Sequence, residues 1–174
     1  GTYDGNGKTI SNLTMTSSAS AVGLFGTVAS GGTLSGVTLT NVAVTCNLGG
    51  RADTGGLVGK ILAGATVTNC QVTGGFVKHT AGNVIGGLAG SSAGTITGCM
   101  ASVTVSGPGF NMGGLLGRID CASCGSCGVY ESGATGSVSS TATASASTSS
   151  VGGLIGLSVL GRVERCFATG TVSG

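Results

Sequence analysis

The sequence has little charge and few aromatic residues. Charged residues make up 7% of the 174 residues, and seven Lys and Arg against five Asp and Glu leave a net charge of +2. Nucleic acids and acidic membranes are bound by clustered cations, so this composition argues against both as partners. Tryptophan is absent and aromatic residues make up 3%. The chain therefore has few aromatic side chains on which bases or sugars could stack.

Long apolar runs, helix signals and histidines are scarce too. No run approaches the roughly 18 apolar residues of a membrane span, so we expect none. No segment combines helical apolar spacing with capping residues, and each of the 37 glycines would cost a helix interior about 1 kcal/mol. His79 is the one histidine, and by spacing it has no Ser, Cys or Asp partner. We expect essentially no helix and interpret His79 as a solvated turn residue.

What the sequence does contain is a tetrapeptide, Gly-Leu-x-Gly, that occurs five times. Its first glycines are 33, 31, 27 and 39 residues apart, and the last four copies follow a further glycine. Periods of this length are typical of stacked supersecondary units. The repeated positions are Gly23, Leu24, Gly26, Gly56, Leu57, Gly59, Gly87, Leu88, Gly90, Gly114, Leu115, Gly117, Gly153, Leu154 and Gly156.

Short runs of alternating apolar and small polar residues follow the tetrapeptides, as in residues 65–74, 94–105 and 161–172. They are rich in Val, Ile and Thr and are closed by glycines, which predicts short strands separated by turns. The chain is therefore expected to be all-β.

The tetrapeptide with its strand resembles the GLUG motif family, named for glycine, leucine, a variable residue and glycine. The resemblance covers nearly the whole chain, because residues 1–14 look like the segment that leads into such arrays. It implies a parallel β-helix (β-solenoid) on secreted or surface-anchored, adhesin-like bacterial proteins. No cofactor is expected. Some relatives attach the repeats to a metallopeptidase that cleaves immunoglobulin A, but with one histidine the zinc signature of such a peptidase is absent here.

We expect one β-solenoid domain of about five coils over residues 1–174. The 39-residue step places a looped insertion in the fourth repeat, where insertions into solenoids are tolerated. The Ser/Thr/Ala run at 137–150 fits either a looped excursion or an additional strand. The predicted lead-in half-coil is 1–15, and the predicted repeats are 16–45, 46–76, 77–107, 108–140 and 141–174.

Four cysteines follow the first glycine of their repeats by 12 to 14 residues, and Val37 takes this place in the first repeat. A cysteine that is replaced by valine at the equivalent position of another repeat behaves as a small core residue, since free cysteine is among the most buried residue types. We therefore predict an inward cysteine ladder of Cys70, Cys99, Cys127 and Cys166.

Cys121 and Cys124 precede Cys127 in a Cys-x-x-Cys-x-x-Cys run. The spacing is shared with iron–sulfur sites, but a local fourth ligand is missing. The preferred interpretation is a local disulfide between Cys121 and Cys124, which fits an oxidising compartment. With Cys46 the total is seven, so at least one thiol stays free or pairs with another chain.

Three weaker candidates remain. Asp4-Gly-Asn-Gly7 resembles part of a calcium loop, although the other ligands are missing and a plain Asx turn explains it. Threonines at 66, 68, 95 and 97 would form a flat lattice as on ice-binding solenoids, but Ser123-Cys124-Gly125 and Arg162-Val163-Glu164 interrupt it. The five carboxylates are scattered, so no catalytic pair is predicted.

The expected function is assembly rather than catalysis. A solenoid exposes unpaired strand edges at its ends unless a cap covers them, and neither end of this sequence looks like a cap. We expect a non-enzymatic extracellular or cell-surface protein that binds itself head-to-tail as the subunit of a fibre or adhesin stalk. Other surface proteins and glycans are further candidate partners. The alternatives are a cropped repeat module of a long adhesin and an ice- or polysaccharide-binding solenoid.

Overall fold

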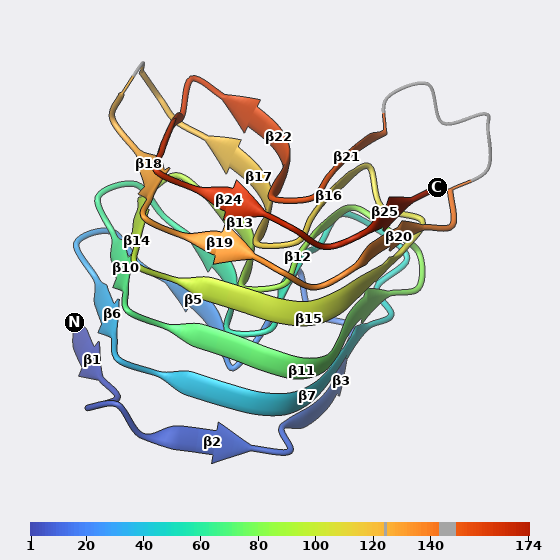
Figure 1. The fold of residues 1–174 in the computed structure, drawn as a ribbon, viewed down its shortest axis with the longest axis horizontal. Coiled ribbons are helices and arrows are strands. Elements are labelled where there is room, and N and C mark those ends of the chain that lie inside the picture. The colour runs from blue at the N-terminus through green and yellow to red at the C-terminus, as the bar shows by residue number, and fades with distance from the viewer. Residues whose placement is uncertain (124, 143–148) are drawn as a thin grey trace.

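The computed structural model describes residues 1–123, 125–142 and 149–174. Twenty-five short strands form four parallel sheets, here called A to D, and the described residues contain no helix. In that part of the chain there is consequently no helix long and apolar enough to cross a membrane. Figure 1 shows the strands stacked in rungs, with the two termini at opposite ends of the stack.

Sheets A and B hold the strands on two sides of each rung. Sheet A contains β1 (Thr2–Asp4), β6 (Thr33–Ser35), β10 (Thr66–Thr68), β14 (Thr95–Thr97), β18 (Gly128–Tyr130) and β23 (Arg162–Glu164). Sheet B contains β2 (Thr9–Ser11), β3 (Thr14–Ser17), β7 (Thr38–Cys46), β11 (Gln71–His79), β15 (Met100–Gly107), β19 (Gly133–Ala134), β20 (Val138–Ser140), β24 (Phe167–Ala168) and β25 (Val172–Ser173).

Sheets C and D complete the rungs. Sheet C contains β4 (Ala21–Val22), β8 (Asp53–Gly55), β12 (Val84–Gly86), β16 (Asn111–Gly113) and β21 (Ser150–Gly152). Sheet D contains β5 (Phe25–Val28), β9 (Val58–Ile61), β13 (Ala89–Ser92), β17 (Leu116–Asp120) and β22 (Ile155–Val159).

The chain visits the sheets in the order A, B, C, D and returns to A one strand further along the stack. After a lead-in half-coil of β1 to β3, each coil runs from sheet C through D and A to B. The coils are β4–β7, β8–β11, β12–β15, β16–β20 and β21–β25, numbered one to five below. The prediction of an all-β parallel β-helix of about five coils is confirmed.

Equivalent residues lie in columns along the stack. Val67 pairs with Leu34 on one side and Ile96 on the other, and Val77 pairs with Val44 and Val105. All six side chains are buried. The strands alternate because their apolar positions point into this shared interior while their threonines face outward.

The corner between sheets A and B is made by one residue in the left-handed conformation. That residue has a φ between 50° and 64° in all five coils, at Gly36, Asn69, Gly98, Glu131 and Arg165. Glycine and asparagine adopt this conformation at little cost, whereas glutamate and arginine do not. In coils four and five the two charged residues form an ion pair, with Arg165 Nη2 2.8 Å from Glu131 Oε1.

The extra length of the fourth repeat is divided between two connections. Seven residues, 121–127, connect β17 to β18, whereas two connect β13 to β14 one coil earlier. The second of these connections lies between β20 and β21. There the Ser/Thr/Ala run contributes Val138–Ser140 to sheet B and begins β21 at Ser150, while residues 143–148 lie outside the described residues.

Candidate binding cleft

Each Gly-Leu-x-Gly tetrapeptide is the sharp bend that connects sheet C to sheet D. In coil two, β8 ends at Gly55 and β9 begins at Val58, so Gly56 and Leu57 form the bend. Leu57 is fully buried, and its backbone N–H donates to the carbonyl of Leu88 in the next coil. The repeated leucines therefore form one column, buried in coils two to four and half-buried at Leu24 and Leu154, in the terminal coils.

The last glycine of the tetrapeptide is required because the backbones of sheets C and D touch. A Cβ atom on Gly90 would lie 2.4 Å from the backbone nitrogen of Thr54 and 2.6 Å from the carbonyl carbon of Asp53. A Cβ on Gly59 would lie 2.5 Å from the nitrogen of Val22. Real Cβ atoms do not approach backbone this closely, so only glycine permits the contact.

A cleft of about 610 Å³ lies where the strands of these two sheets face each other. Its sheet D side includes the register column Thr27, Lys60, Ser91 and Arg118, one residue from each of coils one to four. Its sheet C side includes Asp53 and the neighbouring backbone of Ala52. Parallel strands are about 4.8 Å apart, so this column extends for roughly 14 Å along the solenoid.

Charge is concentrated in this cleft. Five of the twelve charged residues of the chain line it: Arg51, Asp53, Lys60, Arg118 and Asp120. Lys60 Nζ lies 3.9 Å from an oxygen of Asp53, and Arg118 Nη2 lies 2.8 Å from an oxygen of Asp120. The Nε–H of Arg118 is buried and has no acceptor among the described residues. The cleft thus holds one more cation than anions and an unused hydrogen-bond donor.

Asp53 is the acidic group that burial affects most in this cleft. Burial raises the pKa of its carboxyl group, and this effect exceeds the lowering by the Ser91 hydrogen bond and by Lys60, Arg118 and Arg51. A carboxylate that has lost water without full compensation is a candidate functional group.

Sequence reasoning did not find this cleft, because it treated the cations as far apart. A signal was present, since Lys60 and Arg118 each follow the first glycine of their tetrapeptide by four residues. Equal offsets place residues in one column when the coils stack in register, as these do.

The cysteine column differs from the prediction in coil four. Cys70 and Cys99 are buried at equivalent places, and Cys166 is half-buried at the corresponding place in the last coil. The residue that continues their column in coil four is Ser132, not Cys127. Counting from the tetrapeptide gave the wrong residue because the connection at 121–127 displaces the next strand by five positions.

Ser132 replaces the hydrogen bonds of the sulfur as well as its volume. Its Oγ accepts from the N–H of Cys99 at 3.0 Å and donates to the carbonyl of Tyr130 at 2.6 Å. One coil earlier, Cys99 Sγ accepts from the N–H of Cys70 at 3.4 Å and donates to the carbonyl of Thr97. The hydrogen bond with Cys70, together with burial, raises the pKa of the Cys99 thiol. A protonated thiol fits a packing role.

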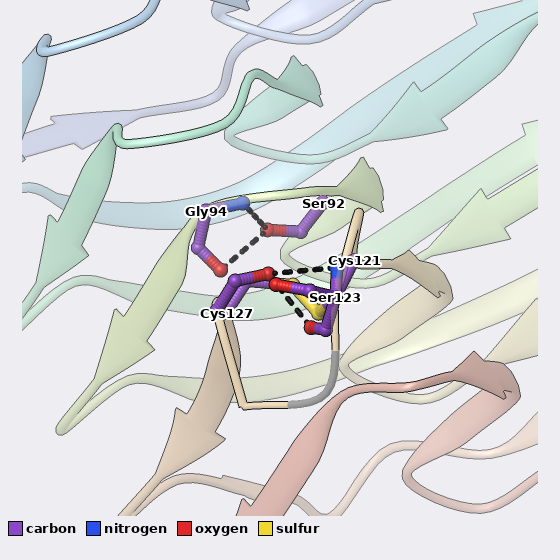
Figure 2. The surroundings of a disulfide bond; sticks show 6 residues. Ser92, Gly94, Cys121, Ser123 and Cys127 are labelled. Carbon is purple, nitrogen blue, oxygen red and sulfur yellow. Dashed lines mark hydrogen bonds between the residues drawn. A yellow bond between two sulfur atoms is a disulfide. The ribbon is translucent and has the colours of Figure 1, made fainter.

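Cys127 instead forms a disulfide with Cys121, with the Cα atoms 5.6 Å apart. Figure 2 shows this bond at the base of the connection between β17 and β18. The predicted pairing of Cys121 with Cys124 is wrong because Cys121 is bonded to Cys127. Cys124 itself lies outside the described residues. Two of the three cysteines of the Cys-x-x-Cys-x-x-Cys run are bonded to each other and cannot ligate an iron–sulfur cluster in this state.

His79 is buried, contrary to the prediction of a solvated turn residue. Its Nδ1 accepts from the backbone N–H groups of Ala81 and Gly82 at 3.1 and 2.8 Å. Its Nε2 is buried without a partner in the described part of the chain, and burial lowers the pKa of the ring. The two accepted hydrogen bonds close the turn after β11.

The two remaining sequence candidates are turn and surface features. Asp4 Oδ1 accepts from the N–H of Asn6 at 2.8 Å, which is the geometry of an Asx turn. Among the described residues, no three His, Cys, Asp or Glu side chains gather as metal ligands. The threonine columns on sheet A end at Gly128 and Tyr130 in coil four, not at residues 123–125 as the sequence count predicted.

Comparison with known proteins identifies the repeat. The family model described as the GLUG motif matches residues 147–173, which contain the fifth tetrapeptide. The other four tetrapeptides occupy the same column of the same fold. The predicted resemblance to the GLUG motif family is therefore confirmed over the fifth repeat.

The fold of this protein is similar to a crystal structure of a proposed immunoglobulin A1 protease from Bacteroides ovatus. The TM-score is 0.62 at 21% identity, over 94% of this chain and 58% of that one. The present chain thus spans little more than half of its structural neighbour, and the likeness concerns the fold. No curated protein matches the sequence.

Proposed function

We propose that this protein is a non-enzymatic structural module of an extracellular or cell-surface protein, and that it extends by stacking its terminal coil on another coil. The observation that carries the proposal is the exposure of core positions in coil five. Val163 and Val172 are 41% and 48% exposed, whereas Val129 and Val138, one coil earlier in the same columns, are 0% and 1% exposed.

The strand edges support the same interpretation. Within the described residues, β23, β24 and β25 have a parallel partner on one side only, and so have β1 and β2 at the other end. Open edges are templates for pairing with another strand. Every strand pairing in the stack is parallel. The exposed edge of coil five can therefore extend the sheets only by pairing with an edge like that of β1 and β2. Such a contact is heterologous, and contacts of this kind propagate into filaments when they do not close.

The side surface of the solenoid favours a structural role as well. Ser, Thr and Gly cover it, and among the described residues the charged groups outside the cleft include the ion pairs of Arg165 with Glu131 and of Arg162 with Glu164. The occupant of the terminal edge that we propose is a second copy of this chain, as in a head-to-tail fibre or stalk. The alternative is a further coil of the same polypeptide, as in a long adhesin.

The test is sedimentation velocity across a hundredfold range of protein concentration, with electron microscopy of the largest species. We expect particles that grow in steps of one subunit. Val163→Lys places a charge on the exposed core position and should keep the protein monomeric. Gln71→Lys, on the outward face of β11, is the matched control and should assemble normally.

A strictly monomeric wild-type protein would exclude the head-to-tail fibre. The intact mass of the natural protein then decides the alternative, because a mass well above 16.3 kDa means that further polypeptide adjoins the terminal coils.

A further inference from the structure

We propose that the cleft between sheets C and D binds a carboxylate-bearing oligosaccharide that lies along the solenoid axis. The proposal goes beyond the stacking role and does not depend on it, because the cleft lies on the side of coils one to four and not at their ends.

The first argument is the placement of charge. Only 7% of the residues are charged, yet three of the seven cations and two of the five anions line this one cleft. Arg162 and Arg165, outside the cleft, each have a carboxylate partner within 2.8 Å. Arg51, in the cleft, has no ion-pair partner within the described residues. The excess cation and its neighbours favour an anionic ligand.

The second argument is the unused donor of Arg118. Its Nη2 is held by Asp120 at 2.8 Å, which fixes the plane of the guanidinium group. The buried Nε–H has no acceptor in the described part of the chain. An oxygen of a bound ligand would satisfy it, and a planar guanidinium group matches a carboxylate well.

The third argument selects a carboxylate over a phosphate. Asp53 and Asp120 share the cleft with the cations, so a dianionic phosphate would face two like charges. An acidic oligosaccharide carries one charge on each sugar and spreads these charges along its length, so each carboxylate meets the two aspartates with a single charge. Asp53 itself is incompletely compensated after burial, since its closest cation, Lys60 Nζ, is 3.9 Å away, and it can accept a hydrogen bond from a ligand hydroxyl.

The fourth argument selects a carbohydrate. The remaining polar lining is small and hydroxyl- or amide-bearing, and among the described residues no aromatic side chain contributes to it. It consists of Ser20, Thr27, Asn83, Ser91 and Ser92. Such a surface hydrogen-bonds a ligand that has many hydroxyl groups and offers nothing on which a flat apolar ring would stack. The column from Thr27 to Arg118 runs along the axis, which suits a linear chain of sugars.

The experiment is a calorimetric and NMR titration of the full chain with tetragalacturonic acid. The neutral control is the same tetramer with its carboxyl groups methyl-esterified, and inorganic phosphate is a second control. We expect the acid to bind and to be recovered intact, the ester and phosphate to bind at least about tenfold more weakly, and added salt to weaken binding.

Arg118→Gln should weaken binding of the acid by about tenfold or more, the effect of losing one charge-assisted contact. Arg165→Gln removes an arginine outside the cleft and should leave binding unchanged. Lys60→Gln changes a half-exposed side chain and provides a second test if Arg118→Gln does not fold.

Absence of binding at millimolar tetramer, equal binding of the ester or of phosphate, or equal weakening by Arg165→Gln would each overturn the proposal. Sedimentation of the same samples is a separate readout. If the protein assembles but does not bind the tetramer, only the binding proposal is rejected. If it binds the tetramer but stays monomeric, only the head-to-tail fibre is rejected.

Discussion

The glycine that ends each tetrapeptide allows a direct test of the contact between sheets C and D. Gly90→Ala would place a methyl group 2.4 to 2.6 Å from three backbone atoms, belonging to Thr54, Asp53 and Gly59. Backbone atoms within a paired sheet cannot move singly, so the two sheets must separate locally. Gly26 is the equivalent residue in coil one, where the nearest atom would be the carbonyl oxygen of Ala21 at 3.4 Å.

The two substitutions should therefore have opposite signs. Overpacking of a rigid core typically costs about 1–3 kcal/mol, and Gly90→Ala should fall at the upper end because every close contact is with backbone. Neither residue has a positive φ, so Gly26→Ala meets no conformational strain. It should raise the free energy of unfolding by about 0.4–1 kcal/mol, through the smaller entropy of its unfolded chain. The expected difference between the two variants is roughly 3–4 kcal/mol.

Urea unfolding followed by far-ultraviolet circular dichroism measures this difference, provided that the slope with denaturant is the same in the three proteins. Equal free energies of unfolding for Gly90→Ala and Gly26→Ala would refute the backbone contact as the reason for the glycine. The motif would then need another explanation, such as the conformational freedom of the bend.

Three further predictions concern buried polar groups and the disulfide. Ser132→Ala should lower the free energy of unfolding by about 1–3 kcal/mol, because the N–H of Cys99 loses its acceptor, and Ser132→Cys should recover part of the loss. Since burial lowers the pKa of His79, the unfolded chain binds its proton more readily; stability should fall as the pH drops below about 6.5, and His79→Asn should remove that dependence in urea titrations. Reduction of the Cys121–Cys127 bond should cost about 2 kcal/mol, and peptide mapping without reductant should recover these two cysteines together.

The fold could be predicted because the physical requirements recur with the repeat. The bend places a leucine in the shared column in every coil and needs a glycine at the sheet contact in coils two to five, so Leu57 and Gly59 have equivalents at constant offsets. The strands alternate for the same reason, since the interior is shared. A requirement that recurs five times is visible in one sequence without any other information.

The error at Cys127 has a physical origin. Cysteine was taken as the marker of the inward column, yet the column requires a small side chain that accepts from one backbone N–H and donates to a carbonyl. A serine meets both requirements, and in coil four Ser132 does so. The inserted connection then brought a disulfide-bonded cysteine to the expected spacing. The residue type identified the wrong position, whereas the pattern of hydrogen bonds identifies the right one.

The cleft escaped prediction because its members become neighbours only through the register of separate coils. Asp53 and Arg118 are 65 positions apart in sequence and belong to different sheets, yet they line one cleft. Lys60 and Arg118 share an offset from the tetrapeptide, but that signal has meaning only once the coils are known to stack in register. No single repeat contains all the residues that line the cleft.

The cleft also differs from the rest of the fold in its energetics. The leucine and glycine columns satisfy packing in coils two to four, whereas Asp53 is desolvated and the buried Nε–H of Arg118 has no acceptor among the described residues. In a solenoid, the stability of each coil depends on its neighbours, and these costs occur in coils two and four, whose motif leucines are fully buried. Asp53→Asn removes a desolvated charge and should therefore stabilise the fold at neutral pH. A substitution that improves stability while weakening binding of an acidic oligosaccharide would show that these groups are maintained for a ligand and not for the coil.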